Sequence, residues 1–219
     1  MKKIVVGLLA LISLFGMVAF AADFAQPTPN SVILCDFESL ADGTAIDSKD
    51  TSKEYITTPD QVSIFFYDDG AAGKSSHLTA NVVNDAAQGS KGLKIDWTLD
   101  GWTGIGLQSP AGKTGPMWNW ENAKSITFYA KSADGKKAAF VIGVADANDE
   151  RFRVAMKTEV SGDQWVKFVL PMNKFKARGD WQPDKAKRNT FIDSPGTQFE
   201  LSPLSAKGSI IIDYVEVNN

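Results

Sequence analysis

Two tryptophans stand among turn-forming and polar residues, where an aromatic ring has little reason to join a core. Trp102 lies in the segment DGWTG, and Trp181 lies in RGDWQP, beside Arg178 and Asp180. A flat aromatic ring covers the C–H face of a sugar, and charged side chains bond the hydroxyls at its edge. An aromatic ring beside a polar pair favours a ligand site. The alternative is that these rings only close the ends of a β-sandwich.

Three further tryptophans fit a structural role better. Trp118 and Trp120 flank one turn in PMWNWEN, and we expect them to dock inward. Trp165 directly precedes a predicted strand, so we expect it to close an end of the fold.

Catalytic motifs are missing from the sequence. His77 is the single histidine and no G-x-S-x-G elbow exists, so a Ser-His-Asp triad is disfavoured. One His and one Cys cannot make a typical zinc site. The glycines of GAAGKSS (70–76) fail the P-loop spacing, and Gly104-Ile105-Gly106 lacks the third glycine of a dinucleotide site. Two-carboxylate glycoside hydrolysis stays open as the less favoured alternative, because acidic residues are abundant.

The elements that must position these residues are short strands. Segments that alternate with period two, or that are rich in β-branched and aromatic residues, are bounded by Gly, Asp, Asn or Pro. They predict strands at 32–38, 62–67, 78–84, 92–99, 104–108, 125–131, 138–145, 151–159, 165–170, 197–201 and 209–217. No long window shows a helical stripe. The pattern predicts an all-β protein, a β-sandwich or jelly roll in a single domain.

The N-terminus reads as an export signal. Residues 1–22 combine Lys2 and Lys3, an apolar run and an Ala19-Phe20-Ala21 site, which predicts a cleaved signal peptide and a secreted or periplasmic protein. An uncleaved membrane anchor is the alternative. Residues 23–31 read as a short leader, and 32–219 as the sandwich domain. Cys35 is the only cysteine, so we expect it to be a buried core residue rather than half of a disulfide.

The second half of the chain resembles a known family. The segment from Gln164 to Pro183, with WVKFVLPMNKFKARGDWQP, and the terminal IIIDYVEV carry the resemblance, together with DFE (36–38) and DGWTG (100–104). They are similar to family-11 carbohydrate-binding modules. The resemblance implies a galactose-binding-like jelly roll that binds mixed-linkage β-glucans and cellulose-like chains without catalysis.

The resemblance also assigns roles to particular residues. Arg178 and Asp180 match the hydrogen-bonding pair beside the sugar, and Trp102 and Trp181 stand where the family has stacking tyrosines. Arg151 lies in a polar segment where the family has further cleft groups. Two positions depart from the family pattern, since Leu201 replaces a cleft tyrosine and Pro195 replaces a cleft acid. These departures leave open a different glycan.

Structural calcium is a further implication of the resemblance. Asp36 and Glu38 lie two apart on a predicted strand, so they share a face, and Asp213 lies on the last strand. If the first and last strands pair, these carboxylates converge as hard oxygen ligands for calcium. A solvated acidic edge, or a salt bridge to lysine, is the alternative.

Net charge limits the range of partners. The formal charge of −3 argues against nucleic acid as a partner. The basic run at residues 185–188 reads as a solvated loop, or as a device that steers an acidic polysaccharide towards the cleft. We expect no membrane partner after signal cleavage, and the oligomeric state stays open. The rival prediction is an envelope or surface structural protein that assembles through the same sandwich.

Overall fold

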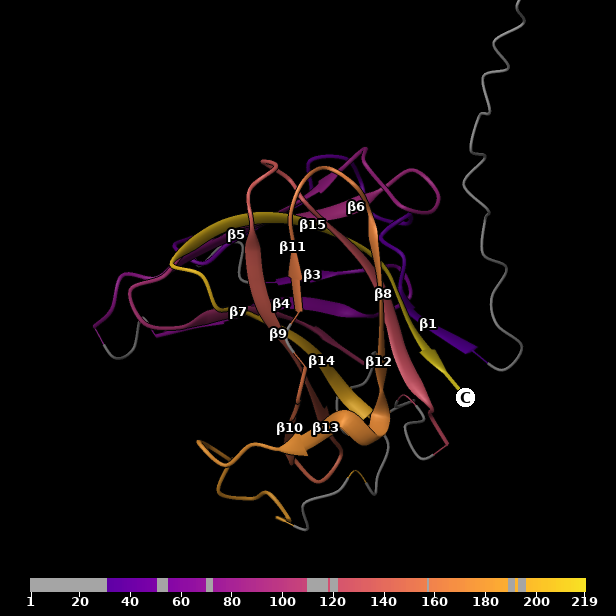
Figure 1. The fold of residues 1–219 in the computed structure, drawn as a ribbon, viewed down its shortest axis with the longest axis vertical. Helices are drawn as coiled ribbons and strands as arrows, with labels where there is room; N and C mark the ends of the chain where they lie inside the picture. Colours follow the sequence, from indigo (N-terminus) through magenta and orange to yellow (C-terminus); the bar gives the residue numbers. More distant parts are fainter. Residues whose placement is uncertain are drawn as a thin grey trace, which may run out of the picture.

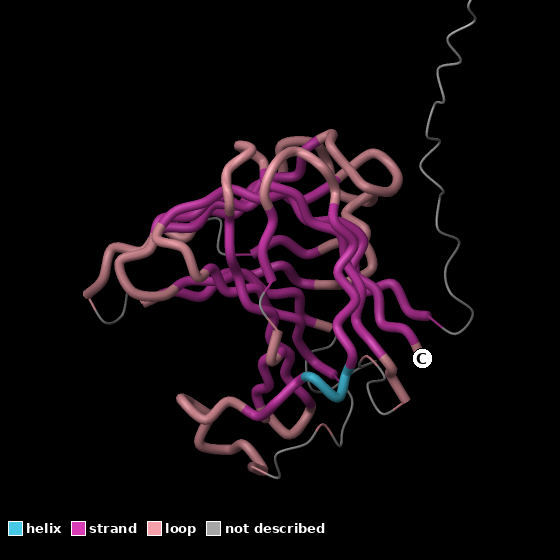
Figure 2. The backbone as a smooth tube through the Cα atoms, in the orientation of Figure 1, coloured by secondary structure: helices cyan, strands magenta, loops and turns pink. Residues whose placement is uncertain are grey.

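The computed structural model describes residues 31–50, 55–69, 73–109, 118, 122–156, 158–188, 192 and 196–219. Within these ranges the protein consists of strands, loops and one 3-10 turn at Met172–Lys174 (Figure 2). The predicted signal peptide and nearly all of the predicted leader lie outside these ranges, as do Trp120 and Pro195. Among the described residues, no helix is long and apolar enough to cross a membrane.

In the part of the chain that the structure describes, fifteen strands form two antiparallel sheets packed face to face (Figure 1). The seven-stranded sheet contains β1 (Ser31–Cys35), β2 (Ala45–Asp47), β5 (His77–Val83), β6 (Gly92–Thr98), β8 (Ser125–Ser132), β12 (Val166–Pro171) and β15 (Lys207–Asn218). The eight-stranded sheet contains β3 (Tyr55–Thr57), β4 (Ser63–Asp68), β7 (Thr103–Gln108), β9 (Ala138–Asp146), β10 (Arg151–Val154), β11 (Thr158–Val160), β13 (Phe175–Ala177) and β14 (Gly196–Pro203).

This architecture confirms the predicted all-β jelly-roll sandwich, and ten of the eleven predicted strands match a single observed strand each. The predicted strand at 151–159 is two strands, β10 and β11, separated by a bend. The short strands β2, β3 and β13 were not predicted, because three residues are too few to show a period. Ser31 opens β1, so the predicted leader runs one residue too far.

The core lies between the sheets and is filled by the inward-facing half of each strand. Phe128 of β8 and Phe140 of β9 come from opposite sheets, with ring centroids 6.2 Å apart, and Phe199 of β14 meets Phe128 edge-on at 5.8 Å. Trp118 is buried as expected, and Cys35 is a buried free thiol whose pKa burial raises to about 12. Burying each large apolar side chain contributes about 1.5–3 kcal/mol, so this packing holds the two sheets in place.

The order of the eight-stranded sheet, β13-β10-β9-β14-β7-β4-β3, places distant parts of the sequence side by side. Strands β10 and β13, from the second half of the chain, belong to the same sheet as β4 and β7 from the first half. The outer surface of this sheet is therefore where residues from many segments meet.

Candidate functional site

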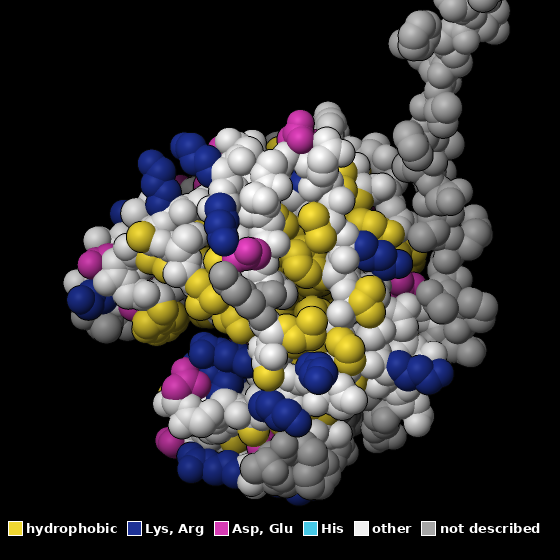
Figure 3. All heavy atoms as spheres, in the orientation of Figure 1, with side chains coloured by type: hydrophobic (Ala, Val, Ile, Leu, Met, Phe, Trp, Pro, Cys, Tyr) yellow, Lys and Arg dark blue, Asp and Glu magenta, His cyan; other side chains and the backbone are white. Residues whose placement is uncertain are grey.

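The outer face of the eight-stranded sheet is hollowed. Figure 3 shows a notch between two lobes of the molecule, with lysine and arginine side chains gathered on one wall and hydrophobic side chains on the other. In Figure 1, the lower lobe carries β10, β13 and the loop that follows β13.

Three aromatic rings form a row at the β4–β7 side of this face. The Tyr67 centroid lies 6.3 Å from that of Phe65 and 6.3 Å from that of Trp102. Phe65 and Tyr67 are partly covered, whereas Trp102 is 55% exposed. We call Phe65, Tyr67 and Trp102 the aromatic row. It offers apolar ring surface that ends in a freely accessible indole.

Glycines on the neighbouring strand make room for these rings. A Cβ on Gly106 would lie 2.5 Å from the Phe65 ring, and a Cβ on Gly104 would lie 2.3 Å from the Tyr67 ring. A larger residue at Gly104 or Gly106 would push the rings off the sheet. The Gly104-Ile105-Gly106 sequence therefore forms the floor under the aromatic row, since strand glycines often mark such a close approach.

A buried carboxylate fixes the loop that carries Trp102. The Trp102 amide donates a hydrogen bond to Asp69 Oδ2 at 2.7 Å, and the Asp69 amide donates to the Trp102 carbonyl at 3.1 Å. The Ser76 hydroxyl also donates to Asp69 Oδ2, at 3.2 Å. Because Asp69 is almost completely buried, it holds the backbone of Trp102 while the indole stays in solvent.

Four cations occupy the β10–β13 side of the same face. On β10, Arg151 and Arg153 point outward between buried neighbours. Arg153 lies directly opposite Lys176 of β13 in the strand pairing. The backbone amide of Arg178 donates a hydrogen bond to the Arg151 carbonyl at 2.9 Å. We call Arg151, Arg153, Lys176 and Arg178 the cationic block.

Asp180 bridges two arginines of the cationic block. Arg178 Nε donates to Asp180 Oδ1 at 3.1 Å and Nη2 donates to Oδ2 at 2.9 Å, while Arg153 Nη1 donates to Oδ2 at 3.2 Å. Hydrogen bonds from Arg178 lower the pKa of Asp180 to about 2, and the charges of both arginines act in the same direction. The carboxylate thus stays ionised at ordinary pH and keeps exposed oxygen available for a ligand hydroxyl.

Arg151 is anchored more deeply than its neighbours. Its Nη1 donates to Glu200 and to Gln198, both on β14, and the Arg151 and Glu200 side chains are mostly buried. On the intervening strand β9, the residue opposite Glu200 is Gly143, and a Cβ there would lie 3.4 Å from Glu200 Oε2. Gln182 holds the loop after β13 against Arg151. Its Oε1 accepts a hydrogen bond from the Arg151 backbone amide, and its Nε2 donates one to the Arg151 carbonyl, both at 2.8 Å.

Trp181 belongs to this charged group rather than to the aromatic row. The Arg178 guanidinium lies 5.3 Å from the centroid of the Trp181 ring, which is within cation–π range, and the ring is 52% exposed. A pocket of about 400 Å³ opens here, between the loop and Glu150. The exposed basic run at Lys185 to Arg188 continues the same loop, as expected for a solvated segment.

Tyr67 connects the two halves of the face. Its hydroxyl lies 2.8 Å from Ser202 Oγ of β14. Burial raises the pKa of Tyr67 and the charge of Glu200 acts in the same direction, while the charges of Arg153 and Arg178 lower it. Because these charged groups act on the Tyr67 hydroxyl, the aromatic row and the cationic block lie within electrostatic reach of each other.

The structure brings some of the predicted site residues together and leaves others apart. Arg151, Arg178, Asp180 and Trp181 do come together, and Trp102 lies across the face in the aromatic row. The prediction that Leu201 occupies a cleft position is wrong, because Leu201 points into the core and its neighbours Glu200 and Ser202 face outward.

Sequence reasoning missed Phe65, Tyr67, Arg153 and Lys176, all of which belong to this face. The signal that could have found them is strand alternation: Arg153 and Lys176 occupy the polar positions of β10 and β13, and a glycine-rich strand leaves room for the rings of β4.

A second hollow, of about 420 Å³, lies on the outer face of the other sheet. Several of its charged groups are paired: His77 bonds Asp47 at 2.8 Å and Lys94 bonds Asp96 at 3.1 Å. Trp97, the only aromatic ring besides His77 that lines it, is buried. This face offers no exposed aromatic platform among its lining residues, so we place the site on the eight-stranded sheet.

The three predicted calcium ligands do not assemble as one cluster. Glu38 and Asp213 both reach the loop at 87–91, where Glu38 accepts the Ser90 and Lys91 amides at 2.7 Å and Asp213 accepts the Ala87 and Gln88 amides. Asp36 instead accepts the Glu38 amide. The part of the chain that the structure describes contains no group of three His, Cys, Asp or Glu residues able to hold a metal ion.

Asp213 keeps one feature that suits a cation. Its Oδ1 is buried with no hydrogen-bond partner, and burial raises the pKa of Asp213 to about 6 although the Gln88 and Ala87 amides lower it. A cation at Oδ1 would offset the cost of burying this charge. Glu38 fits less well, because three hydrogen bonds already occupy its oxygens.

Exposed rings and charged forks on one hollowed face of a β-sandwich define a carbohydrate-binding class of protein. The comparisons with known proteins agree with this class. The model of the family described as "Carbohydrate binding domain (family 11)" matches residues 47–218. The chain belongs to this family, and it therefore carries a carbohydrate-binding domain of a non-catalytic kind.

Solved structures support the fold. The family 11 module from Clostridium thermocellum, in complex with a beta-1,3-1,4-mixed-linked tetrasaccharide, is 16% identical, with a TM-score of 0.59 over 86% of this chain and 95% of that chain. The family 11 module of the cellulosomal cellulase Lic26A-Cel5E of the same organism has a TM-score of 0.57 at 16% identity, covering 86% and 94%. A family 30 carbohydrate-binding module has a TM-score of 0.50 at 14% identity, covering 86% and 87%. The comparison with curated proteins found no match.

Proposed function

We propose that this protein binds a β-glucan-like polysaccharide through the outer face of the eight-stranded sheet, without catalysing a reaction. The observation that carries the proposal is the exposed Trp102 ring on the aromatic row, across from the Arg178–Asp180 fork. The mixed-linked tetrasaccharide bound by the similar Clostridium thermocellum module supports this choice of ligand.

Two kinds of contact would bind the sugar chain, namely ring stacking and hydrogen bonding. The C–H faces of glucose rings stack on Trp102, while Asp180 accepts and Arg178 donates hydrogen bonds to hydroxyls at the ring edges. Trp181, stacked on Arg178, supplies a second ring. Such an open face buries little of the ligand, so we expect weak binding in which the polysaccharide's many repeats compensate for few contacts.

Catalysis is not part of this proposal. The only histidine, His77, lies on β5 in the opposite sheet and is paired with Asp47. On the proposed binding face, Glu200 is held by Arg151 and Asp180 is held as a carboxylate by two arginines, so neither is set up as a general acid.

Affinity electrophoresis in native gels tests the proposal. Mixed-linkage β-glucan, xylan, mannan or pectin is cast into the gel, and the wild type runs beside Trp102→Ala and Trp181→Ala. We expect β-glucan to retard the wild type and Trp102→Ala to lose about tenfold in affinity, or about 1.4 kcal/mol. Trp165→Ala, which removes a tryptophan beside the other sheet, is the matched control. Unchanged mobility in every gel would contradict the proposal.

Export belongs to the same proposal. A protein that binds extended polysaccharides meets them outside the cytoplasm, and residues 1–22 have the three parts of a signal peptide. We expect the protein in the periplasm or medium to begin at Asp23, which N-terminal sequencing measures. A full-length chain retained in the membrane would support the anchor alternative instead.

Calcium binding remains a proposal centred on Asp213. The unpartnered Oδ1 of Asp213 would supply an oxygen ligand to an ion beside the 87–91 loop. A ligand at 100 times its Kd stabilises the folded state by about 2.7 kcal/mol, so calcium should raise the Tm relative to EDTA. Asp213→Ala should abolish that rise, and an identical Tm in calcium and EDTA would argue against the ion.

A further inference from the structure

Lys176 and Arg153 stand directly opposite each other on β13 and β10, and the next cross-strand neighbours are Arg151 and Arg178. Like charges at opposed positions destabilise a sheet unless something compensates them. Here two successive cross-strand pairs consist of four cations on one outward face. This arrangement is unusual for a purely structural surface.

The compensation within the protein is incomplete. Glu200 neutralises Arg151, and the single carboxylate of Asp180 serves both Arg178 and Arg153. Lys176 is exposed and forms no ion pair with any residue that the structure describes. Four cations thus face two carboxylates. Glu150 and Arg188, which line the adjoining pocket, cancel each other and leave this excess unchanged.

The sign of this excess is opposite to that of the chain as a whole, which carries a formal charge of −3. The excess is therefore local to the cationic block rather than a result of general basicity. Beside it, the exposed Lys185 and Lys187 outnumber the neighbouring Asp184. A patch of this kind attracts anions and orients them as they approach.

We propose that the cationic block binds an acidic substituent, a carboxylate or a sulfate ester, on the polysaccharide that lies across the aromatic row. Arg153 and Lys176 contact this group, because the side chains of Arg151 and Arg178 are mostly buried. Arg153 is more exposed and bonds Asp180 through Nη1 alone, and Lys176 is exposed. Guanidinium groups form bidentate hydrogen bonds with carboxylates and sulfates alike. This inference rests on the proposed function and adds that the bound polysaccharide carries acidic substituents.

The experiment compares three ligands of matched chain length: mixed-linkage β-glucan, its carboxymethylated derivative and its sulfated derivative. Affinities are measured by isothermal titration at low salt and again at about 1 M salt, where the Debye length falls to about 3 Å. We expect at least one acidic derivative to bind about tenfold more tightly than the neutral glucan at low salt, and the preference to vanish at high salt. The derivative that binds more tightly than the neutral glucan identifies the recognised group as carboxylate or sulfate.

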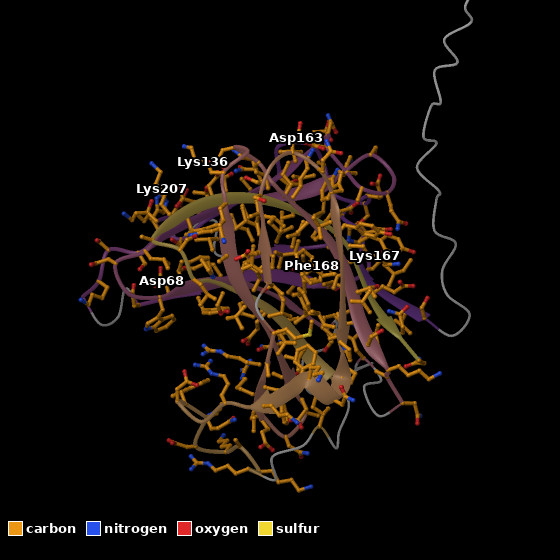
Figure 4. The ribbon with its side chains drawn as sticks, viewed as in Figure 1. Asp68, Lys136, Asp163, Lys167, Phe168 and Lys207 are labelled. Carbon is orange, nitrogen blue, oxygen red and sulfur yellow. The ribbon has the colours of Figure 1, made fainter. Side chains whose placement is uncertain are left out.

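The variant Lys176→Glu locates the effect. It should abolish the preference for the acidic derivative and leave the affinity for neutral glucan within about twofold. Lys136→Glu makes the same charge change in the exposed β8–β9 turn, at the opposite end of the view from β10 and β13 (Figure 4), and should leave the preference intact.

Each failure has a distinct meaning. Equal affinity for neutral and acidic glucans, or a preference that survives Lys176→Glu, would overturn this inference while the proposed function stands. Absence of binding to all three ligands would overturn both.

Discussion

The aromatic row and the cationic block share one sheet face, and they are built in opposite ways. Phe65 and Tyr67 lie over a floor of glycines, so packing positions their rings. In contrast, Arg178 and Arg153 are positioned by the charge of Asp180. The comparison shows that packing and charge position different side chains on the face of a single sheet. The row should be insensitive to salt and pH, whereas the block should respond to both.

The largest effect is expected from breaking the floor of the aromatic row. Gly104→Val places a Cβ 2.3 Å from the Tyr67 ring and 2.7 Å from the Leu201 carbonyl, so either the ring or the backbone must move. Overpacking of this kind costs about 1–3 kcal/mol, and it displaces the row. Thermal unfolding and glucan titration should both report a loss. A Gly104→Val variant with full glucan affinity would contradict the assigned floor.

A loss of stability that leaves the aromatic row in place is expected when the cationic block loses its deepest counterion. Glu200→Ala leaves the mostly buried Arg151 without its carboxylate, and hydrogen bonds to charged groups contribute about 1.5–3 kcal/mol. Chemical denaturation should show lower stability, while Glu200→Gln should recover part of it. Unchanged stability in Glu200→Ala would mean that this ion pair does not hold the block.

The hydroxyl that joins the two regions should contribute less. Tyr67→Phe removes the hydrogen bond to Ser202 but keeps the ring, so stability should fall by about 1 kcal/mol and glucan affinity should stay nearly constant. Denaturant midpoints and titration measure the two quantities. A large affinity loss would show that the hydroxyl contacts the ligand instead of only fixing the ring.

The smallest effect concerns pH. Because the pKa of Asp180 is lowered to about 2, its contribution to stability and to the arginine fork is fully present above about pH 4 and is lost as the pH falls through about 2. Glucan affinity should therefore be flat from about pH 4 to 8. Asp180→Asn should remove any decline that the wild type shows below about pH 4, and a wild-type transition near pH 6 would point to a different group.

The comparison between these regions also explains what sequence could and could not reveal. Alternation predicted the sandwich because long strands such as β9 repeat their period several times. The Arg178–Asp180–Trp181 cluster was predictable because its members are close in sequence. The aromatic row was not: Tyr67 and Trp102 meet through strand pairing, which the linear pattern does not encode. Leu201 was misplaced because a one-residue error in register exchanges the two faces of a strand.

Mapping the bound ligand shows whether the glycan lies on the outer face of the eight-stranded sheet. Amide chemical-shift changes are recorded during titration with a mixed-linkage glucan tetrasaccharide. We expect the changes to cluster at Trp102, Gly104, Arg153 and Asp180 on the outer face of the eight-stranded sheet. Changes centred instead on His77, Lys94 and Asp96, around the hollow of the opposite sheet, would contradict it.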